Sequence, residues 1–407
     1  MLYQFTFRNF RSYKNETVFD LQAVSSQGFN ESLLYNSDDN NPFLPVSVIY
    51  GPNGGGKSNV LKALFCVNYL ITLPVYIFEH QIMSNHDSGF SQIIPFAFDD
   101  VSAKQPTDFE LFFSSESEYD YKYNISVLDG VITQESLYRK KRSPKSRIAM
   151  VFERSAEKIE LGACFTKKSI NTKINSKLPF LSSLKIGYSF DFIDDIIMWF
   201  QNSIMVNYAN PIAESKLWLA KDDNFKSKLI TLMNDAGIPI SNYEIIKESD
   251  NPKSSKILFE HTVNGHKYNL NINQESDGTR KLFAVLPHVI MALSDGRLIA
   301  FDELDAKLHP KLLKFIVMLF KNPEINKKNA QLIFTSHDVS TMKSSVFRTD
   351  EIWFACKLAD ESSDLYSLYE IRDENNNRIS PLAAFDKQYL EGRYGADPYF
   401  TNMMNWK

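Results

Sequence analysis

Short apolar runs that end in polar residues are the strongest pattern in the chain. Residues 46–50, 297–301 and 331–335 each have the length and the β-branched or aromatic content of a buried strand. After the first run, residues 59–70 place apolar side chains on helical spacing, and we expect this helix to end before Pro74. The three runs predict parallel strands whose polar ends meet at one edge of a sheet, where ligands bind.

Short aromatic and β-branched runs fill the interval from 93 to 160. Turns rich in Asp, Gly and Ser separate them, most clearly at residues 128–130, and the pattern predicts antiparallel strands. The expected runs are residues 96–98, 109–113, 121–127 and 130–133. A strand over residues 2–8 opens the chain, and a turn at 9–13 leads to another strand near 16–21. That turn is either an ordinary hairpin connection or a surface under a bound purine.

Amphipathic helices are predicted over residues 191–208 and 216–236, with their apolar faces in core or lid packing. Strand-like alternation returns at residues 257–272 around a turn at 263–265. Residues 27–41, rich in Ser, Asn, Asp and Gly, are typical of a surface loop. No long heptad array appears, which argues against an extended coiled-coil arm.

The composition is that of a soluble globular protein. Of 407 residues, 43% are apolar and 13% aromatic, enough for a large core and two or three domains. A net charge of −4 gives no overall attraction to nucleic acid, so such a contact needs the local basic run at residues 139–147. The alternative interpretation of this run is a solvated hairpin tip. The three cysteines lack metal-ligand spacing, and neither a signal peptide nor a membrane span is found, so we expect a cytoplasmic protein with reduced thiols.

The strongest candidate for chemistry is the segment 51–58, Gly-Pro-Asn-Gly-Gly-Gly-Lys-Ser, between the first predicted strand and the first predicted helix. This spacing lets backbone N–H groups surround phosphate oxygens at a helix N-terminus, while Lys57 reaches the β- and γ-phosphates and Ser58 ligates Mg²⁺. The alternative is a glycine-rich turn without a ligand, but the strand-loop-helix setting favours a P-loop that binds ATP and Mg²⁺. The residues expected around the nucleotide are Asn53, Gly54, Gly55, Gly56, Lys57, Ser58 and Asn59.

Polar residues that suit the second half of a nucleotide site follow the other two apolar runs. Asp302, at the end of a buried strand, is the expected second metal ligand beside Ser58. Glu303 is placed to orient the attacking water or to accept its proton. His337 can donate to the γ-phosphate; a lone histidine is usually structural, but the parallel strands place this one at the ligand edge.

Residues 275–282 open another helix, which runs towards Asp295 and Gly296. Ser276 and Gly278 expose a positive helix terminus with a hydroxyl and free N–H groups. This arrangement suits a phosphate and is equally typical of an ordinary capped helix.

Six motifs, taken in order along the chain, resemble the ABC-type ATPase family that includes the SMC, RecF and OLD proteins. They are residues 9–12, the P-loop, and residues 276–279, 301–305, 308–310 and 336–337. The resemblance implies an α/β fold, an ABC/SMC-type P-loop ATPase head with a mixed sheet, an antiparallel β lobe and an inserted helical lid. We expect a discontinuous head over residues 1–90 and 270–407, the β lobe over 91–165, and the lid with a short β return over 166–269.

The same resemblance implies how ATP is held. Two heads would sandwich it, with Lys57 and Ser58 of one subunit facing Ser276 and Gly278 of the other. Asp305 would make a contact across that interface, and the histidine after the third strand would be the switch histidine.

Other positions carry the resemblance less completely. Arg11 and Ser12 would lie near the base of the nucleotide. The sequence departs from transporters at Asp277 and Thr279, where those proteins have glycine and glutamine. Gln92 is a weak candidate for the glutamine-loop residue.

The C-terminal stretch is similar to the prokaryotic AbiLi/RloA-like ATPases of abortive-infection and anti-phage systems, on residues 348–354, 363–366 and 389–398. In OLD proteins a Toprim nuclease follows the ATPase, whereas about seventy residues follow His337 here, too few for such a domain. The resemblance implies an ATP-hydrolysing sensor or scaffold that responds to a phage-derived trigger. It would form a homodimer or larger oligomer and control a separately encoded effector, often a nuclease.

Two other functions stay open at this stage. One is a RecF- or SMC-like DNA-repair ATPase that clamps DNA, in which case neutralising the basic run would weaken DNA binding. The other is a nuclease in its own right, which would show metal-dependent cleavage by the single chain.

Overall fold

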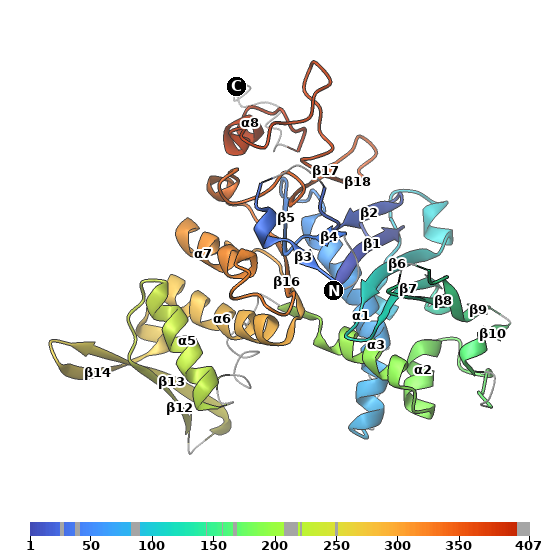
Figure 1. Ribbon diagram of the computed structural model, residues 1–407, viewed down its shortest axis with the longest axis horizontal. Helices are drawn as coiled ribbons and strands as arrows, with labels where there is room; N and C mark the ends of the chain where they lie inside the picture. The colour runs from blue at the N-terminus through green and yellow to red at the C-terminus, as the bar shows by residue number, and fades with distance from the viewer. Residues whose placement is uncertain are drawn as a thin grey trace.

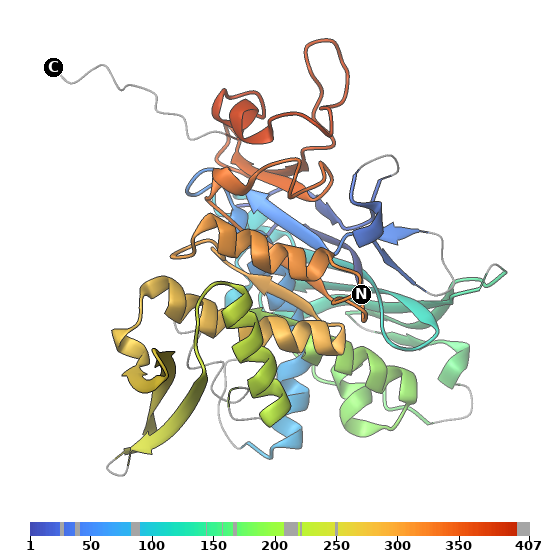
Figure 2. The ribbon, with the colours of Figure 1, turned by 60° about the vertical axis from the view of Figure 1, so that its left-hand side comes forward.

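The computed structural model describes residues 1–24, 28–36, 41–82, 90–143, 145–156, 158–165, 169–206, 219, 222–248 and 251–396. Two large sheets organise this part of the chain, and a smaller sheet projects at one side (Figure 1). Helices lie between the two large sheets and on the outer side of the parallel one (Figure 2).

A six-stranded, mainly parallel sheet carries the strand before the P-loop at its centre. Its order is β11-β15-β16-β5-β17-β18, and only β18 runs antiparallel to its neighbour. The strands are β5 (Val46–Tyr50), β11 (Ile204–Val206), β15 (Leu298–Phe301), β16 (Gln331–Thr335), β17 (Ile352–Lys357) and β18 (Ser363–Ser367). Because β5, β15 and β16 run in one direction, their polar ends meet at one edge, which confirms the predicted parallel arrangement.

A seven-stranded antiparallel sheet has the order β10-β9-β8-β7-β6-β1-β2. It joins the first two strands of the chain to the aromatic-rich interval as β1 (Leu2–Arg8), β2 (Thr17–Asp20), β6 (Thr107–Ser114), β7 (Tyr119–Leu128), β8 (Val131–Lys141), β9 (Ala149–Ser155) and β10 (Ile159–Leu161). Alternate side chains of β6 and β7 are buried, as expected for a sheet with one covered face. A two-stranded sheet, β3 (Leu34–Tyr35) with β4 (Pro42–Phe43), lies beside it.

Helix α1 (Lys57–Glu79) connects the two large sheets. One apolar cluster contains its side chains together with those of Phe5 and Leu111 from the antiparallel sheet and of Ile49 and Ile333 from the parallel sheet. Helices α2 (Phe180–Gly187) and α3 (Asp191–Asn202) complete this layer. Among the residues described, α1 is also the one helix with the length and apolar content of a membrane span, but 56% of that apolar window is buried inside the protein, which is typical of a core helix.

A second apolar cluster covers the other face of the parallel sheet. It contains α6 (Asp277–Asp295), α7 (Pro310–Lys321), α5 (Asp223–Asp235) and α8 (Phe385–Leu390). A three-stranded antiparallel sheet packs on this cluster through β12 (Asn242–Glu248) and β13 (Asn251–Val263), and β14 (His266–Asn271) pairs with β13 as its edge strand. The turn between β13 and β14 is the one predicted at 263–265.

Three predicted elements differ from the structure. Helix α1 passes through Pro74 to Glu79, because the helix beyond the proline still buries Val75 against the core. Residues 96–98 form no strand, since the backbone N–H of Phe96 donates to the Asn9 side chain and not to a neighbouring strand. The helix predicted to continue to residue 208 ends at Asn202, and β11 then extends the edge of the parallel sheet.

Several predicted segments lie partly outside the described residues. They are the loop at 27–41 (for residues 27 and 37–40), the basic run at 139–147 (for residue 144), the helix at 216–236 (for residues 216–218 and 220–221) and the C-terminal motif at 389–398 (for residues 397–398).

Candidate nucleotide-binding site

The loop between β5 and α1 packs closely against β17 and the start of β18. Gly51 and Gly56 have φ angles of 143° and 109°, in the region that favours glycine. A Cβ on Gly51 would lie 2.0 Å from the carbonyl oxygen of Ala355, and one on Gly56 would lie 2.5 Å from Ser363 Oγ. Both glycines are therefore required for this close approach, and the loop ends at the N-terminus of a 23-residue helix, a favourable place for phosphate.

The first residue of that helix, Lys57, folds back onto its own loop. Its Nζ donates to the carbonyl oxygens of Gly51 at 2.9 Å and Pro52 at 3.0 Å. Burial lowers the pKa of this lysine, while the carboxylates of Asp302 and Glu303 act in the opposite direction. The ammonium group is thus held at the mouth of the loop by two weak acceptors that a phosphate could replace.

The two expected metal ligands lie together. Ser58 Oγ donates to Asp302 Oδ1 at 2.9 Å, and Thr335 Oγ1 donates to the same oxygen at 2.7 Å. A hydroxyl and a carboxylate beside a phosphate loop suit Mg²⁺, which takes its remaining ligands from phosphate and water. No cluster of three or more His, Cys, Asp or Glu side chains suited to a metal occurs in the part of the chain that is described.

Three polar residues from the ends of β15 and β16 form one constellation. Glu303 adopts a φ of 52°, and its N–H donates to Thr335 Oγ1 at 2.7 Å. Its carboxylate lies 4.0 Å from Nε2 of His337, and both side chains are partly exposed, at 51% and 40%. The backbone N–H of His337 donates to Asp305 Oδ2 at 3.0 Å. The structure therefore brings Glu303 and His337, which the sequence assigned to the γ-phosphate end of the site, next to Asp305, which the resemblance assigned to the contact between two heads.

The turn after β1 lies beside the P-loop, so it does more than join two strands. Ser12 Oγ accepts hydrogen bonds from Asn59 Nδ2 and from Ser363 Oγ, each at 2.8 Å. Arg11 adopts a φ of 54°, and its guanidinium donates to the backbone oxygen of Gln92 at 3.4 Å. The contact with Arg11 places the backbone of Gln92 next to the turn; its assignment to the glutamine loop stays a prediction.

The start of α6 has an ordinary cap. Ser276 Oγ accepts a hydrogen bond from the N–H of Thr279 at 3.1 Å. Asp277 pairs with Arg280 in the same turn and with Lys307 at 3.3 Å, and these cations hold the pKa of Asp277 below its usual value. The turn thus contacts its own helix and the loop that carries Asp305.

Three further residues of this region were not found from the sequence. Thr335 donates to Asp302 and supports Glu303, Ser363 contacts the turn after β1, and Lys281 is buried on α6 close to the charge of Asp305. Thr335 ends a predicted strand, so its position at the polar edge was a usable signal. Ser363 and Lys281 lie in segments that the sequence analysis singled out, but no role at the nucleotide site was assigned to either, and only the fold places them here.

The basic run begins at the end of β8 and continues into the connection to β9. Three of its cations have local partners: Lys141 pairs with Glu118 at 2.9 Å, Arg142 bonds the backbone oxygen of Tyr119 at 3.2 Å, and Arg139 lies over the Tyr119 ring. This geometry matches the interpretation of a solvated hairpin end.

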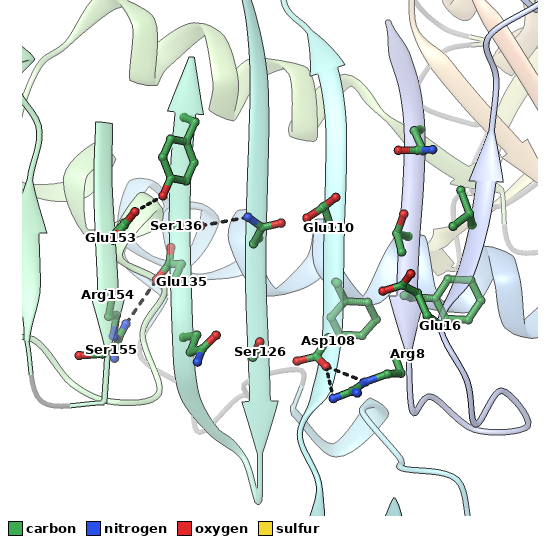
Figure 3. Close-up of a pocket in the computed structure, with 18 of the residues that line it drawn as sticks. Arg8, Glu16, Asp108, Glu110, Ser126, Glu135, Ser136, Glu153, Arg154 and Ser155 are labelled. Carbon is green, nitrogen blue, oxygen red and sulfur yellow. Dashed lines mark hydrogen bonds and ion pairs between the residues drawn. The ribbon is translucent and has the colours of Figure 1, made fainter. Parts of the chain in front are cut away.

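A hollow of about 910 Å³ lies on the outer face of the antiparallel sheet, on the side opposite the helices (Figure 3). Figure 3 shows two ion pairs among its charged side chains, Arg8 with Asp108 and Arg154 with Glu135. None of the predicted nucleotide-site residues lines it. It is therefore separate from the P-loop.

Comparison with solved structures finds SMC heads and the recombination mediator protein RecF. "Crystal structure of the SmcHead bound to the C-winged helix domain of ScpA" is 15% identical over 90% of this chain and 97% of that one, with a TM-score of 0.45. The SMC head domain from Thermotoga maritima is 12% identical over 90% and 98%, with a TM-score of 0.41. RecF from the RecFOR pathway is 14% identical over 90% and 98%, with a TM-score of 0.31. At these TM-scores the similarities carry no argument, and the fold rests on the topology described above.

Comparison with curated proteins finds no match. Comparison with protein families does: the model described as "AAA domain, putative AbiEii toxin, Type IV TA system" matches residues 46–343, which include the P-loop, Asp302 and His337. The chain therefore belongs to this AAA-domain family and is a P-loop ATPase.

Proposed function

We propose that the protein is the ATP-hydrolysing sensor or scaffold of a prokaryotic anti-phage, abortive-infection system. Pairing of two heads around ATP controls a separately encoded effector, often a nuclease, after a phage-derived trigger is recognised in the cytoplasm. The AbiEii-type description of the family supports a defence role. The head comprises residues 1–90 and 270–407, with the β lobe at 91–165 and the lid at 166–269.

The separate positions of the P-loop and of the turn at Ser276 support the pairing of two heads. The P-loop, Asp302 and Glu303 gather at one edge of the parallel sheet, whereas the Ser276 turn bonds to its own helix and to Lys307. A helix N-terminus that offers a hydroxyl is a phosphate site, and it serves here as the missing half of the nucleotide site of a second copy. Each head then supplies one half of two shared sites.

The residues of one head take distinct roles in hydrolysis. Bound Mg²⁺ neutralises phosphate charge, and Ser58 and Asp302 would hold it. Lys57 leaves the carbonyls of Gly51 and Pro52 for the phosphates. Glu303 orients the attacking water, and its contact with the imidazole of His337 keeps that ring at the γ-phosphate end of the site.

Mass photometry of the chain, co-expressed with its genomic neighbours, tests this function. Glu303→Gln should keep ATP binding but slow hydrolysis by about 100-fold or more, because the water loses its carboxylate. ATP-dependent dimers should then accumulate on this variant, in a complex with a neighbouring gene product. Glu324→Gln, which changes an exposed carboxylate on a surface loop, is the matched control.

Other outcomes would replace the proposal. A protein that stays alone, dimerises with ATP and gains mass only when DNA is added would indicate the DNA-repair clamp. Metal-dependent DNA cleavage by the single chain, unaffected by Glu303→Gln, would indicate a nuclease. A Glu303→Gln variant that neither loses hydrolysis nor accumulates dimers would contradict both the catalytic assignment and the head-pairing mechanism.

A further inference from the structure

Lys281 is a buried cation that no role described so far explains. It lies on α6, one turn after the cap residue Ser276, and its side chain is only 5% exposed. Burial lowers its pKa to about 7, and the charge of Asp305 is the strongest opposing influence, followed by that of Glu303. A lysine is rarely kept in such a place unless its charge is used.

The Asp305 carboxylate, opposite in charge to Lys281, is also partly shielded from water. One carboxylate oxygen, Oδ2, accepts the backbone N–H of His337 at 3.0 Å. The other, Oδ1, is shielded from water and has no hydrogen-bond partner among the residues described. Burial of an unpaired carboxylate oxygen costs free energy, and a positive charge nearby offsets that cost.

The loop that carries Asp305 also contacts the start of α6 at the surface. Asp277 and Lys307 form an ion pair at 3.3 Å, and a Cβ on Gly278 would lie 3.4 Å from the carbonyl oxygen of Lys307. Within the loop, the N–H of Leu308 donates to the carbonyl oxygen of Asp305 at 2.9 Å. The first turn of α6 and this loop are thus in contact at the surface. Lys281 follows Asp277 by four residues and Gly278 by three, so it lies on the same side of the helix as the residues that contact the loop.

We propose that Lys281 is a positioning residue for ATP hydrolysis: it stabilises the Asp305 carboxylate, which holds the backbone of His337 and keeps the imidazole beside Glu303. A shift of α6 when a second head binds would then change the positions of His337 and Glu303. The proposal rests on the catalytic roles proposed for Glu303 and His337 and requires no effector.

Steady-state ATP hydrolysis by the full chain tests it. Lys281→Met keeps the length of the side chain without its charge and should lower kcat about 10-fold or more. It should leave KM, and the affinity for a fluorescent ATP analogue, within about 3-fold, because the proposed role acts through Asp305 and involves no contact with ATP. Lys281→Arg should restore most of the lost kcat.

A double-mutant cycle identifies the partner. Asp305→Asn should lower kcat to a similar extent, and the double variant should be no more than about 2-fold slower than the slower single variant. Losses that multiply would show that Lys281 and Asp305 act separately, and would overturn the proposal. Asp305→Asn alone keeps the proposal testable where Lys281→Met fails to fold, since an unchanged kcat in that variant is also contradictory.

Two reference variants separate the possible explanations. Lys321→Met removes a buried lysine that pairs with Glu351 at 2.6 Å, far along the chain from the loop; it should lower the melting temperature without lowering the kcat of the folded protein. Glu303→Gln reports on the proposed catalytic role itself. If Lys281→Met hydrolyses ATP normally and Glu303→Gln does not, the role of Lys281 is contradicted and the catalytic role of Glu303 stands. If Glu303→Gln also hydrolyses ATP normally, the catalytic assignment is contradicted.

Discussion

Asp302 is the residue on which the nucleotide site converges. Its Oδ1 accepts hydroxyl hydrogen bonds from α1, through Ser58, and from β16, through Thr335. The Thr335 hydroxyl also accepts the N–H of Glu303, whose φ of 52° turns the chain away from β15. One hydroxyl therefore fixes both the expected metal ligand and the expected catalytic carboxylate, and Thr335 links their positions.

Ser363 offers a test at the scale of a single residue. Its hydroxyl donates to Ser12 Oγ, which also accepts from Asn59 at the start of α1. Ser363→Ala removes one support of the turn beside the P-loop, so we expect KM for ATP to rise by about 3- to 10-fold, near 1 kcal/mol, with little change in kcat.

Initial-rate kinetics over a range of ATP concentrations measure this effect. Ser367→Ala, at the far end of the same strand, is the control and should behave as the wild type. A fall in kcat at constant KM would show that the serine acts on hydrolysis and not on binding.

The residues of the site divide by how far the sequence could predict them. Lys57, Ser58 and Asp302 were predicted because local sequence patterns, the P-loop spacing and the end of a buried strand, are enough to assign a chemical role to each. Ser363 and Lys281 were not, because each obtains its role from a neighbour more than twenty residues away in sequence. Such pairs follow from the folded topology and from no local pattern.

At the scale of elements, α6 connects the turn at Ser276 to the apolar core that covers the parallel sheet. Almost every side chain from Thr279 to Leu293 is buried, and Pro287 lies within the helix. His288 on this helix is 2% exposed, and its Nδ1 lies 3.1 Å from the carbonyl oxygen of Ala284. Its imidazole ring packs edge-on against the ring of Phe301. The element is thus a core helix along its length.

The burial of His288 makes stability depend on pH. Desolvation lowers the pKa of His288 below 6.5 in the folded protein, so between its folded pKa and 6.5 the unfolded chain binds a proton that the native state does not. The free energy of unfolding should therefore fall as pH decreases below about 6.5, with a slope of up to about 1.4 kcal/mol per pH unit from this group.

Urea unfolding at pH 7, 6 and 5 measures this slope. His288→Gln, which stays neutral, should show a shallower fall than the wild type over that range. His266→Gln, in the exposed β13–β14 hairpin, should leave the slope unchanged. Equal slopes in the wild type and His288→Gln would contradict a buried neutral histidine.

Element predictions succeeded where periodicity was long and failed where tertiary contacts decided. Strands β6 and β7 alternate between buried and partly exposed side chains over seven or more residues, enough to identify them, whereas β8 was predicted only over residues 130–133 and extends to Lys141. Residues 96–98 carry the same aromatic signal but bond to the Asn9 side chain. The three residues of β11 are too few for a pattern, and only pairing with β15 makes them a strand.

At the scale of the whole molecule, the side chain of Gln331 is one of the direct contacts between the two large sheets, which also share the cluster around α1. Gln331, the first residue of β16, accepts the N–H of Leu2 at 2.7 Å and donates to the carbonyl oxygens of Leu2 at 3.0 Å and Leu44 at 3.3 Å. It is 1% exposed. The start of the antiparallel sheet is thereby attached to the parallel sheet through a residue 329 positions away.

Replacing that glutamine should loosen the molecule without changing its site. Gln331→Leu leaves three buried backbone groups without their partner, so we expect the free energy of unfolding to fall by about 3 kcal/mol. KM for ATP should stay within about 2-fold, because the residue lies at the opposite end of β16 from Thr335. Urea unfolding followed by circular dichroism is the measurement, with the exposed Gln134→Leu as control; equal midpoints would contradict the role.

The position of β5 between β16 and β17 has a consequence for biosynthesis. The P-loop leaves the ribosome early, but β16 and β17, the two strands that flank β5, lie between Gln331 and Lys357, more than 280 residues later in the chain. At about 5–20 residues per second, roughly 15–60 s separate β5 from the end of β17. All strands of the antiparallel sheet precede residue 162. A nascent chain can thus form that sheet while it is still unable to hold ATP, so a chain cut short by interrupted translation would carry no working ATPase.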